Sequence, residues 1–352
     1  MKLREFDPGR VSSILFILLY FIGDILLSTP VINALKTAFP ASRLSVLLKK
    51  RAHGVLVGNP LVDEIIEYDG AARYHSPVWL GLLAARLRRT RYDLAVDLTG
   101  DLRSSWLLYA AEPGFRVGFN HAGCGFLLDR AVPYRATGHV VDHLLGAVAS
   151  IGAAPADPMP RMLVSEGERA AARALLERHG LRDGAPFLAA CPGAGSPLRR
   201  WPPERFGALA AEARDRHGLP TVVTGAPHES ALAEAVVAAS RGAAVSVAGA
   251  TDLRILAALL GLARAFVGND SGTMHVAASQ GTPVVALFGP TAPERFGPRG
   301  APSRVLWPCS PCSPCGGRRC GRPEGPCMNA IGVGEAGAAL DALLSETAGA
   351  VR

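Results

Sequence analysis

The segment FVGNDSGTMH, residues 266–275, combines side chains that can bind phosphate or take part in proton transfer. An apolar strand leads into a small polar loop, and a helix is predicted to open at Met274. The first turn of a helix has unpaired N–H groups and about half a unit of positive charge, so it attracts a pyrophosphate without a cation. The predicted ligand contacts in this segment are Asp270, Ser271, Gly272, Thr273 and His275. The pattern indicates a nucleotide site, although an ordinary strand-to-helix turn capped by an Asp or Ser side chain has the same appearance.

Two further loops, PGAGSPLRRWP and TGAPHE, follow predicted strands in the second half of the chain. In the first loop, backbone N–H groups around Gly195 and Ser196 can surround phosphate oxygens. The guanidinium of Arg199 can bind two oxygens of a diphosphate at once. In the second loop, Glu229 can accept hydrogen bonds from ribose hydroxyls. Each loop alone also fits a common turn, and Glu229 also fits a carboxylate in a first helical turn.

Asp24 stands in a similar position in the first half of the chain, directly after an apolar run and Gly23. A carboxylate at the carboxyl end of a parallel strand can accept the proton of an alcohol, and such general-base catalysis contributes about 10²- to 10⁴-fold. The alternative is that Asp24 only complements the dipole of the helix that it opens. A dinucleotide fingerprint is absent, because this turn lacks the second and third glycines.

Length, composition and charge limit the class of protein. A chain of 352 residues exceeds what one hydrophobic core usually organises, and a hydrophobic content of 49% predicts that it is folded. The net charge of +7 and two basic clusters, Lys49 to Arg51 and the arginines from Arg86 to Arg91, favour an anionic partner, although a solvated basic face is the alternative. Aromatic residues make up only 6% and do not alternate with basic ones, so nucleic acid is not expected as a partner. A phosphorylated substrate or a membrane surface fits better.

The apolar run at residues 14–22 follows three basic residues and therefore resembles the core of an export signal. It is too short to span a bilayer, and no Ala-x-Ala cleavage site follows it promptly. A buried first strand of a parallel sheet explains the run more simply.

Strand and helix patterns alternate twice along the chain, which predicts two parallel, doubly wound sheets. The predicted strands are residues 11–19, 43–48, 65–68, 94–98, 116–119, 187–191, 221–224, 244–247, 265–267 and 284–288. The predicted helices are residues 25–39, 79–89, 139–151, 203–217, 229–239, 253–260, 274–280 and 335–344. We predict an N-terminal Rossmann-like domain at 1–155, a C-terminal one at 156–332 and a last helix within 333–352, with ligands bound at a cleft between strand ends. The proline-rich stretch 152–160 is the predicted connection.

Five cysteines crowd one segment, residues 309–327, with the spacing C-x2-C-x2-C-x4-C-x6-C. The cysteines are Cys309, Cys312, Cys315, Cys320 and Cys327. Such a cluster fits a structural metal site in a chain that otherwise looks cytosolic. Disulfides, or thiols that only pack within a loop, remain open alternatives.

Read in order, these motifs resemble the lipopolysaccharide heptosyltransferases of glycosyltransferase family 9. The resemblance rests on GDILLSTP, PGAGSPLRRWP, TGAPHE, VGNDSGTMH and LFGPT, and it extends over residues 11–331. It implies a GT-B fold and inverting transfer of heptose from ADP-heptose to a sugar hydroxyl of the lipid A–core precursor. It also implies a cytoplasmic enzyme, attached peripherally to the inner face of the inner membrane. Other nucleotide-sugar transferases and a catalytically silent nucleotide-sugar binding protein are the alternatives.

The resemblance assigns roles to individual residues. Asp24 is implied to be the base, Glu229 to contact the ribose and the segment from Asp270 to Thr273 to contact the nucleotide sugar. No cofactor is expected, because helix N-termini and arginine can neutralise the diphosphate. Arg199 stands where many members of the family carry lysine, and Tyr20 to Ile22 lack the basic residue expected before Gly23.

Overall fold

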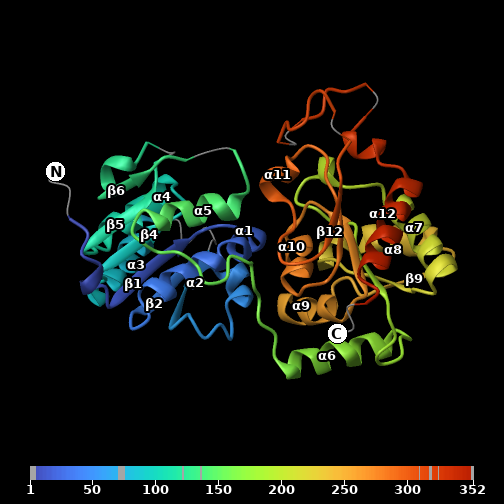
Figure 1. Cartoon of the computed structure of the whole chain (residues 1–352), viewed down its shortest axis with the longest axis horizontal. Coiled ribbons are helices and arrows are strands. Elements are labelled where there is room, and N and C mark those ends of the chain that lie inside the picture. Colours follow the sequence, from blue (N-terminus) through green and yellow to red (C-terminus); the bar gives the residue numbers. More distant parts are fainter. Residues whose placement is uncertain are drawn as a thin grey trace. The chain divides into compact units, whose positions relative to one another are not determined.

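The computed structural model describes residues 5–69, 76–120, 123–134, 137–308, 310–316, 319–323 and 325–349. The chain divides into two compact units, Met1–Leu163 and Val164–Arg352 (Figure 1). The division lies just after the proline-rich stretch that was predicted as a connection. Each unit is an α/β fold built on a six-stranded sheet in which all pairings are parallel.

The sheet of the N-terminal unit has the strand order β3-β2-β1-β4-β5-β6. Its strands are β1 (Ser13–Leu18), β2 (Arg43–Lys49), β3 (Glu64–Tyr68), β4 (Leu94–Asp97), β5 (Phe115–Phe119) and β6 (Arg130–Val132). The apolar run from Ile14 forms β1, whose residues Ile14 to Leu18 are fully buried because β2 and β4 pair with its two edges and helices cover the faces of the sheet. The prediction of a buried first strand is therefore confirmed.

Helices and 3-10 turns connect these strands. They are η1 (Pro8–Arg10), α1 (Ile22–Leu27), α2 (Thr29–Ala38), η2 (Lys50–Val55), α3 (Pro77–Thr90), α4 (Leu102–Ala110), η4 (Gly125–Leu127) and α5 (Val140–Ala149). The single helix predicted at 25–39 is instead two helices that meet at Ser28. Pro30 has no N–H to continue the helical ladder, and the hydroxyl of Thr29 donates to the carbonyl of Leu26 at 2.8 Å instead.

The sheet of the C-terminal unit has the order β12-β11-β10-β7-β8-β9. Its strands are β7 (Leu188–Cys191), β8 (Thr221–Val223), β9 (Ala244–Ser246), β10 (Ala265–Asn269), β11 (Val284–Leu287) and β12 (Ser303–Leu306). The helical segments are α6 (Glu166–Arg178), η5 (Pro197–Arg199), α7 (Pro203–His217), η6 (Pro227–Glu229), α8 (Ser230–Ala239), α9 (Leu253–Leu262), α10 (Gly272–Ser279), α11 (Pro293–Phe296), η7 (Cys327–Ala330) and α12 (Val333–Glu346).

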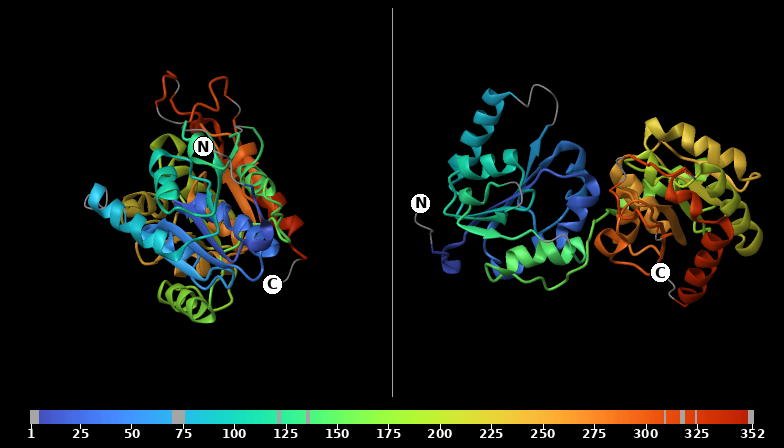
Figure 2. Two further views of the ribbon diagram at one scale, coloured as in Figure 1. Left: turned by 90° about the vertical axis from the view of Figure 1, so that its left-hand side faces the viewer. Right: turned by 90° about the horizontal axis from the view of Figure 1, so that it is seen from above.

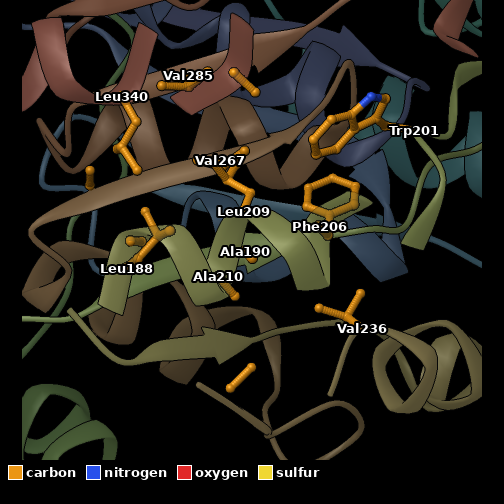
Figure 3. Close-up of a cluster of buried hydrophobic side chains, with 14 of the residues drawn as sticks. Leu188, Ala190, Trp201, Phe206, Leu209, Ala210, Val236, Val267, Val285 and Leu340 are labelled. Carbon is orange, nitrogen blue, oxygen red and sulfur yellow. The ribbon is translucent and has the colours of Figure 1, made fainter. Parts of the chain in front are cut away.

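The core of the C-terminal unit includes Trp201, which is fully buried at one side of the cluster (Figure 3). Its ring meets that of Phe206 edge-on at 5.0 Å between centroids, and its indole N–H donates to the carbonyl of Ile331 at 2.9 Å. Leu340 of α12 packs in the same cluster. The last helix, which the sequence placed in a separate segment, is therefore part of this unit.

Both sheets share one topology. In each, the first strand of the unit lies at the centre and the chain then extends to one side before it crosses to the other. The order therefore reverses between β1 and β4, and between β10 and β7. Ligands of open parallel sheets bind outside the carboxyl ends of the strands at such a reversal. Within the described residues, the structure contains no helix with both the length and the apolar character that crossing a bilayer requires.

Candidate functional site

The loops that were predicted to bind a nucleotide all follow strands of the C-terminal unit at the carboxyl edge of its sheet. The loop containing Ser196 and Arg199 follows β7, the loop containing Glu229 follows β8, and the loop containing Asp270 follows β10. Because β7 and β10 are neighbours at the reversal of strand order, two of these loops are adjacent. The topology therefore gathers the predicted donor contacts at one edge of one sheet.

The N-terminus of α10 has the features of an anion site. Ser271 is its N-cap, but the side chain makes no capping hydrogen bond to the first turn. The hydroxyl of Ser271 and the Nε of Arg199 are both buried, and neither has a hydrogen-bond partner within the described residues. Buried polar groups without partners are costly, and all these groups are hydrogen-bond donors. An oxyanion would satisfy the N–H groups of the first turn together with the Ser271 hydroxyl and the Arg199 Nε.

Asp270 is buried beside this N-terminus and is held from two sides. Its Oδ2 accepts a hydrogen bond from the hydroxyl of Thr291 at 2.6 Å and lies 3.2 Å from Nη1 of Arg199. Burial raises the pKa of Asp270, and the contacts from Thr291 and Arg199 act in the opposite direction. Arg199, predicted as a phosphate contact, therefore also anchors the carboxylate from the β10 loop. The sequence analysis assigned no role to Thr291.

Asn269 connects the two adjacent loops and was missed as a site residue. It is fully buried at the end of β10; its Oδ1 accepts from the N–H of Trp201, and its Nδ2 donates to the carbonyl of Pro192, both at 2.9 Å. An amide can satisfy a donor and an acceptor at once, which fixes the β7 loop against β10. A polar amide at the end of the otherwise apolar strand AFVGN was the available signal.

Glu229 lies at the end of η6, and its Oε2 accepts a hydrogen bond from the N–H of Ala226 at 2.9 Å. The carboxylate also covers Gly193 so closely that a Cβ there would lie 2.1 Å from Oε1 of Glu229. A side chain at position 193 would therefore displace the Glu229 carboxylate from its present position. A Cβ at Gly195 would meet no atom within 4 Å, so the close approach within this loop lies at Gly193. Ligand binding by Gly195 stays a prediction.

Cys191 lies between these loops at the end of β7. It is buried, and burial raises the pKa of its thiol, with Glu229 acting in the same direction. The thiol is therefore neutral at neutral pH, although its hydrogen bonds with Thr273, Gly193 and Thr224 act on the pKa in the opposite direction. His275, another predicted contact, is buried on α10.

In the N-terminal unit, Asp24 lies in the first turn of α1, directly beyond β1. The adjacent strand β4 ends at Asp97, which is fully buried and organises the neighbouring loop. Its carboxylate accepts hydrogen bonds from the N–H groups of Thr99 and Gly100 at 2.9 and 3.1 Å and from the hydroxyl of Ser104 at 2.8 Å. Burial raises the pKa of Asp97 to about 6. The acidic end of the strand LAVD was a signal that the sequence analysis did not use.

Basic side chains surround the start of α1. Lys49 and Arg51 lie over the ring of Phe21, at 5.2 and 4.3 Å from its centroid. Burial and the charge of Arg51 lower the pKa of Lys49, while the charge of Asp24 raises it. Basic side chains from the end of β2 and from η2 thus lie beside Phe21, close to the position before Gly23 where the family pattern led us to expect a basic residue.

The cysteine segment packs against the loop after β11. A Cβ at Gly289 would lie 2.6 Å from the sulfur of Met328 and 3.1 Å from that of Cys327. The described cysteines of the segment, Cys312, Cys315, Cys320 and Cys327, are all free thiols, and Cys309 lies outside the described residues. No group of three or more His, Cys, Asp or Glu side chains in the described ranges is placed to hold a metal ion. A structural metal at this segment remains a prediction.

Comparisons with known proteins agree with this architecture. The chain is 28% identical to lipopolysaccharide heptosyltransferase 2 of Salmonella typhimurium over 303 residues, which cover 81% of this chain and 85% of that one. Among solved structures, a family 9 glycosyltransferase from Veillonella parvula superposes with a TM-score of 0.87 at 26% identity, covering 98% of this chain and all of that one. The ADP-heptose lipopolysaccharide heptosyltransferase II of E. coli gives a TM-score of 0.76 at 26% identity, with coverages of 96% and 99%.

The structural matches confirm the predicted α/β fold of the GT-B class with two Rossmann-like units. Residues 81–324 match the profile described as "Glycosyltransferase family 9 (heptosyltransferase)". That range begins within α3, spans the rest of the N-terminal sheet and the whole C-terminal sheet, and ends in the cysteine segment. The chain therefore belongs to glycosyltransferase family 9, the heptosyltransferase family.

Proposed function

We propose that this protein transfers a heptose from ADP-heptose to a sugar hydroxyl of a lipopolysaccharide core precursor, with inversion at the anomeric carbon. The observation that carries the proposal is the N-terminus of α10, where the buried Ser271 hydroxyl and the Arg199 Nε lack partners within the described residues. The names of the relatives, lipopolysaccharide heptosyltransferases 2 and 3, support the donor and the acceptor class.

The C-terminal unit holds the donor in this proposal. The diphosphate lies at the first turn of α10, where Ser271, Gly272 and Thr273 supply donors. Arg199 adds a positive charge. Gly195 and Ser196, in the loop after β7, contact the donor from that side. Glu229 accepts hydrogen bonds from the ribose hydroxyls through Oε1, while Oε2 accepts the N–H of Ala226. His275, near the start of the same helix, is a further contact to the donor in this proposal.

The N-terminal unit holds the acceptor and the base. Asp24 removes the proton of the acceptor hydroxyl as its oxygen attacks the anomeric carbon. Lys49 and Arg51 favour an acceptor that carries negative charge, because both lie around the start of the helix that bears Asp24. The assignment explains why the base and the anion site stand on separate Rossmann-like units.

The reaction is a single displacement. The bond from the acceptor oxygen forms as the bond to the β-phosphate breaks, so that positive charge develops on the sugar ring and negative charge on the departing ADP. The helix N-terminus and the Arg199 guanidinium stabilise that negative charge. The proposal therefore requires no cofactor, because these groups supply the positive potential at the leaving group.

We also propose that the enzyme works at the cytoplasmic face of the inner membrane as a peripheral protein, because the acceptor class is lipid-linked. The alternative functions are transfer of a different sugar from ADP, UDP or GDP, and nucleotide-sugar binding without turnover. Thermal shift with each nucleotide sugar separates the donors, since a ligand at 100 times its dissociation constant adds about 2.7 kcal/mol to stability.

The decisive experiment is mass spectrometry of a truncated lipopolysaccharide core incubated with this protein and ADP-heptose. The expected product is heavier than the core by one heptose, and anomeric analysis shows inversion. Binding of ADP-heptose without any product would favour the silent binding protein. A product formed only from another nucleotide sugar would identify a different transferase.

A further inference from the structure

Exposed apolar side chains are distributed unevenly between the two units. Of the eleven large hydrophobic residues that are exposed within the described ranges, ten belong to the N-terminal unit, and Val305 alone belongs to the other. Scattered single residues of this kind are normal on a protein surface, but a contiguous group indicates an interaction site.

Six of these residues lie on three adjoining segments, α3, α4 and η4. They are Val78, Leu82, Leu102, Trp106, Tyr109 and Phe126. The spacing of Val78 and Leu82, and of Leu102, Trp106 and Tyr109, places each set on one face of its helix. Helix α4 contacts both α3 and η4, and Figure 2 shows α3 and α4, coloured cyan and teal, next to each other. These six residues are called the α3–α4 face below.

The exposure of these side chains is high for their size. Val78 and Leu102 are each 73% exposed, Leu82 66% and Phe126 75%. The buried residues Leu83, Ala84 and Leu87 already attach α3 to the core, so the exposed residues are not needed for that contact. A second apolar stripe on the opposite side of an anchored helix requires another explanation.

Positive charge borders the α3–α4 face. Arg86, Arg88 and Arg89 lie on the second half of α3, and Arg91 is the residue that caps it. Arg86 and Arg88 form ion pairs with Glu64 and Glu112 at 3.1 and 2.8 Å. Arg89 and Arg91 are exposed and have no ion pair within the described residues. Their charge is therefore available to an anionic surface.

We propose that the α3–α4 face docks on a lipid bilayer that carries anionic headgroups. Aliphatic residues that insert among acyl chains, Trp and Tyr at the level of the headgroups and arginines for the phosphates are the composition that interfacial binding uses. Arg89 and Arg91, without ion pairs within the described residues, end the same helix that carries Val78 and Leu82, so one element presents apolar and cationic groups together, which fits an anionic bilayer. The proposal extends the function proposed above, whose acceptor is lipid-linked, and its test does not depend on sugar transfer.

The experiment is flotation of the full-length protein with vesicles of phosphatidylcholine alone or with about one third phosphatidylglycerol. The protein is expected to float only with the anionic vesicles, and less so at high salt. Brominated acyl chains are expected to quench the fluorescence of Trp106, so that Trp106→Phe removes most of the quenched signal. Fully buried Trp201 provides the unquenched reference.

Two variants separate the apolar and charged contributions. Arg89→Glu with Arg91→Glu is expected to weaken partitioning at least about 30-fold, because each basic residue near an anionic surface contributes about 5-fold. Val78→Glu with Leu82→Glu is expected to weaken it at least about 10-fold. The matched control is Arg178→Glu with Arg182→Glu, two exposed arginines at and after the end of α6 in the other unit. This control should bind vesicles as the unmodified protein does.

Three results would overturn the proposal. They are equal flotation of both α3–α4 variants and the unmodified protein, loss of flotation in the control pair, and a change of oligomeric state in the variants without any vesicle binding. The last result would make the face a contact between protein copies. Transfer to a soluble, deacylated acceptor should be retained by both variants, so a failure here and a failure of the proposed function give different outcomes.

Discussion

Nη1 of Arg199 lies 3.2 Å from Oδ2 of Asp270, and the same carboxylate oxygen accepts the hydroxyl of Thr291. The arginine comes from the loop after β7, the aspartate follows β10, and the threonine follows β11. Oδ2 of Asp270 thus links the loops that follow β7, β10 and β11. Since the Nε of Arg199 remains without a hydrogen bond within the described residues, the guanidinium can hold the protein and a phosphate at the same time.

Replacing Arg199 tests this double role. Arg199→Ala should raise the Kd for ADP about 10- to 150-fold, because it removes a charged hydrogen-bond donor. It should also raise the pKa of Asp270 further, since burial then acts without the opposing charge. Arg199→Lys keeps the charge and should show a clearly smaller loss. Calorimetric titration with ADP measures the three Kd values, which should rise from the unmodified protein through Arg199→Lys to Arg199→Ala. Equal Kd values for these proteins would exclude Arg199 from the donor site.

Replacing Asp24 tests the base. Asp24→Asn should lower kcat by at least about 100-fold, since the amide cannot accept the acceptor's proton. The Kd for ADP should stay nearly unchanged, because Asp24 belongs to the N-terminal unit. The matched control is Asp142→Asn, which changes an aspartate in the first turn of α5. Substantial turnover by the Asp24 variant in a coupled ADP-release assay would exclude it as the base.

Replacing Glu229 tests ribose recognition. Glu229→Ala should raise the Kd for ADP about 10- to 100-fold through lost hydrogen bonds to the ribose. The Kd for inorganic pyrophosphate should change little, since that ligand has no ribose. Glu234→Ala, on the exposed side of α8, is the control. If pyrophosphate and ADP weakened equally, Glu229 would be a support of the loop and not a ribose contact.

The stability of the protein should depend on pH through Asp97. The pKa of Asp97 is raised to about 6 by burial, so the folded protein binds this proton more readily than the unfolded chain. The residue therefore favours folding most below about pH 4, and a contribution of about 3 kcal/mol is lost as the pH rises to about 6. Asp97→Asn should remove this dependence, and its amide can still accept from the Thr99 or Gly100 N–H.

Asp93 provides a control of opposite sign. Burial acts to raise the pKa of Asp93, but the hydrogen bonds from Ser12 and Ser13 outweigh it and lower the pKa. Asp93→Asn should therefore lose stability mainly above about pH 4. Urea unfolding of both variants and the unmodified protein from about pH 2.5 to 7.5 measures the two effects, since the Asp93 contribution changes only near and below about pH 4. Parallel curves for the Asp97 variant and the unmodified protein would contradict the assignment.

Asn269 should be important for stability as well as for the site. Asn269→Ala leaves the N–H of Trp201 and the carbonyl of Pro192 buried without their partner. The expected loss in the free energy of unfolding is about 2–4 kcal/mol. Asn33→Ala removes a comparable amide acceptor, for the N–H of Ala156, from a less buried position and should cost less. Denaturant unfolding compares the two variants.

Much of the fold was predictable from the sequence because local patterns agree with the tertiary structure. The helix predicted at 203–217 is α7 with the same limits, since Pro203 opens it and Gly218 closes it in the left-handed conformation. Helices α4 and α6 were missed: α4 buries Ser104 and Ser105 and exposes Leu102 and Trp106, so its apolar residues do not mark the core side, and α6 is made mostly of charged residues and alanine. Strands β6 and β12 were also missed; each pairs on one side only, and short edge strands carry little apolar signal.

The positions of the candidate site residues were predictable from the sequence, and their contacts less so. Glycine-rich loops after apolar strands placed Asp270, Ser271 and Glu229 at strand ends, where the structure has them; their roles stay predictions. The roles of Asn269, Thr291 and Gly193 depend on partners that are distant in the chain, such as Trp201 for Asn269. Pairing across a sheet decides these contacts, and a linear pattern does not contain that information. The ion pair between Arg199 and Asp270 likewise joins residues that are distant in the chain.

Each of the two sheets is completed by strands from its own half of the chain. Within the described residues neither half contributes a strand to the sheet of the other, and under the function proposed above each half carries one of the two binding sites. A hybrid enzyme that joins residues up to Leu163 of this protein to the second half of a relative should therefore fold, and it should inherit its acceptor preference from one parent and its donor preference from the other. Acceptor and donor choice can then diversify independently in evolution and be recombined in the laboratory.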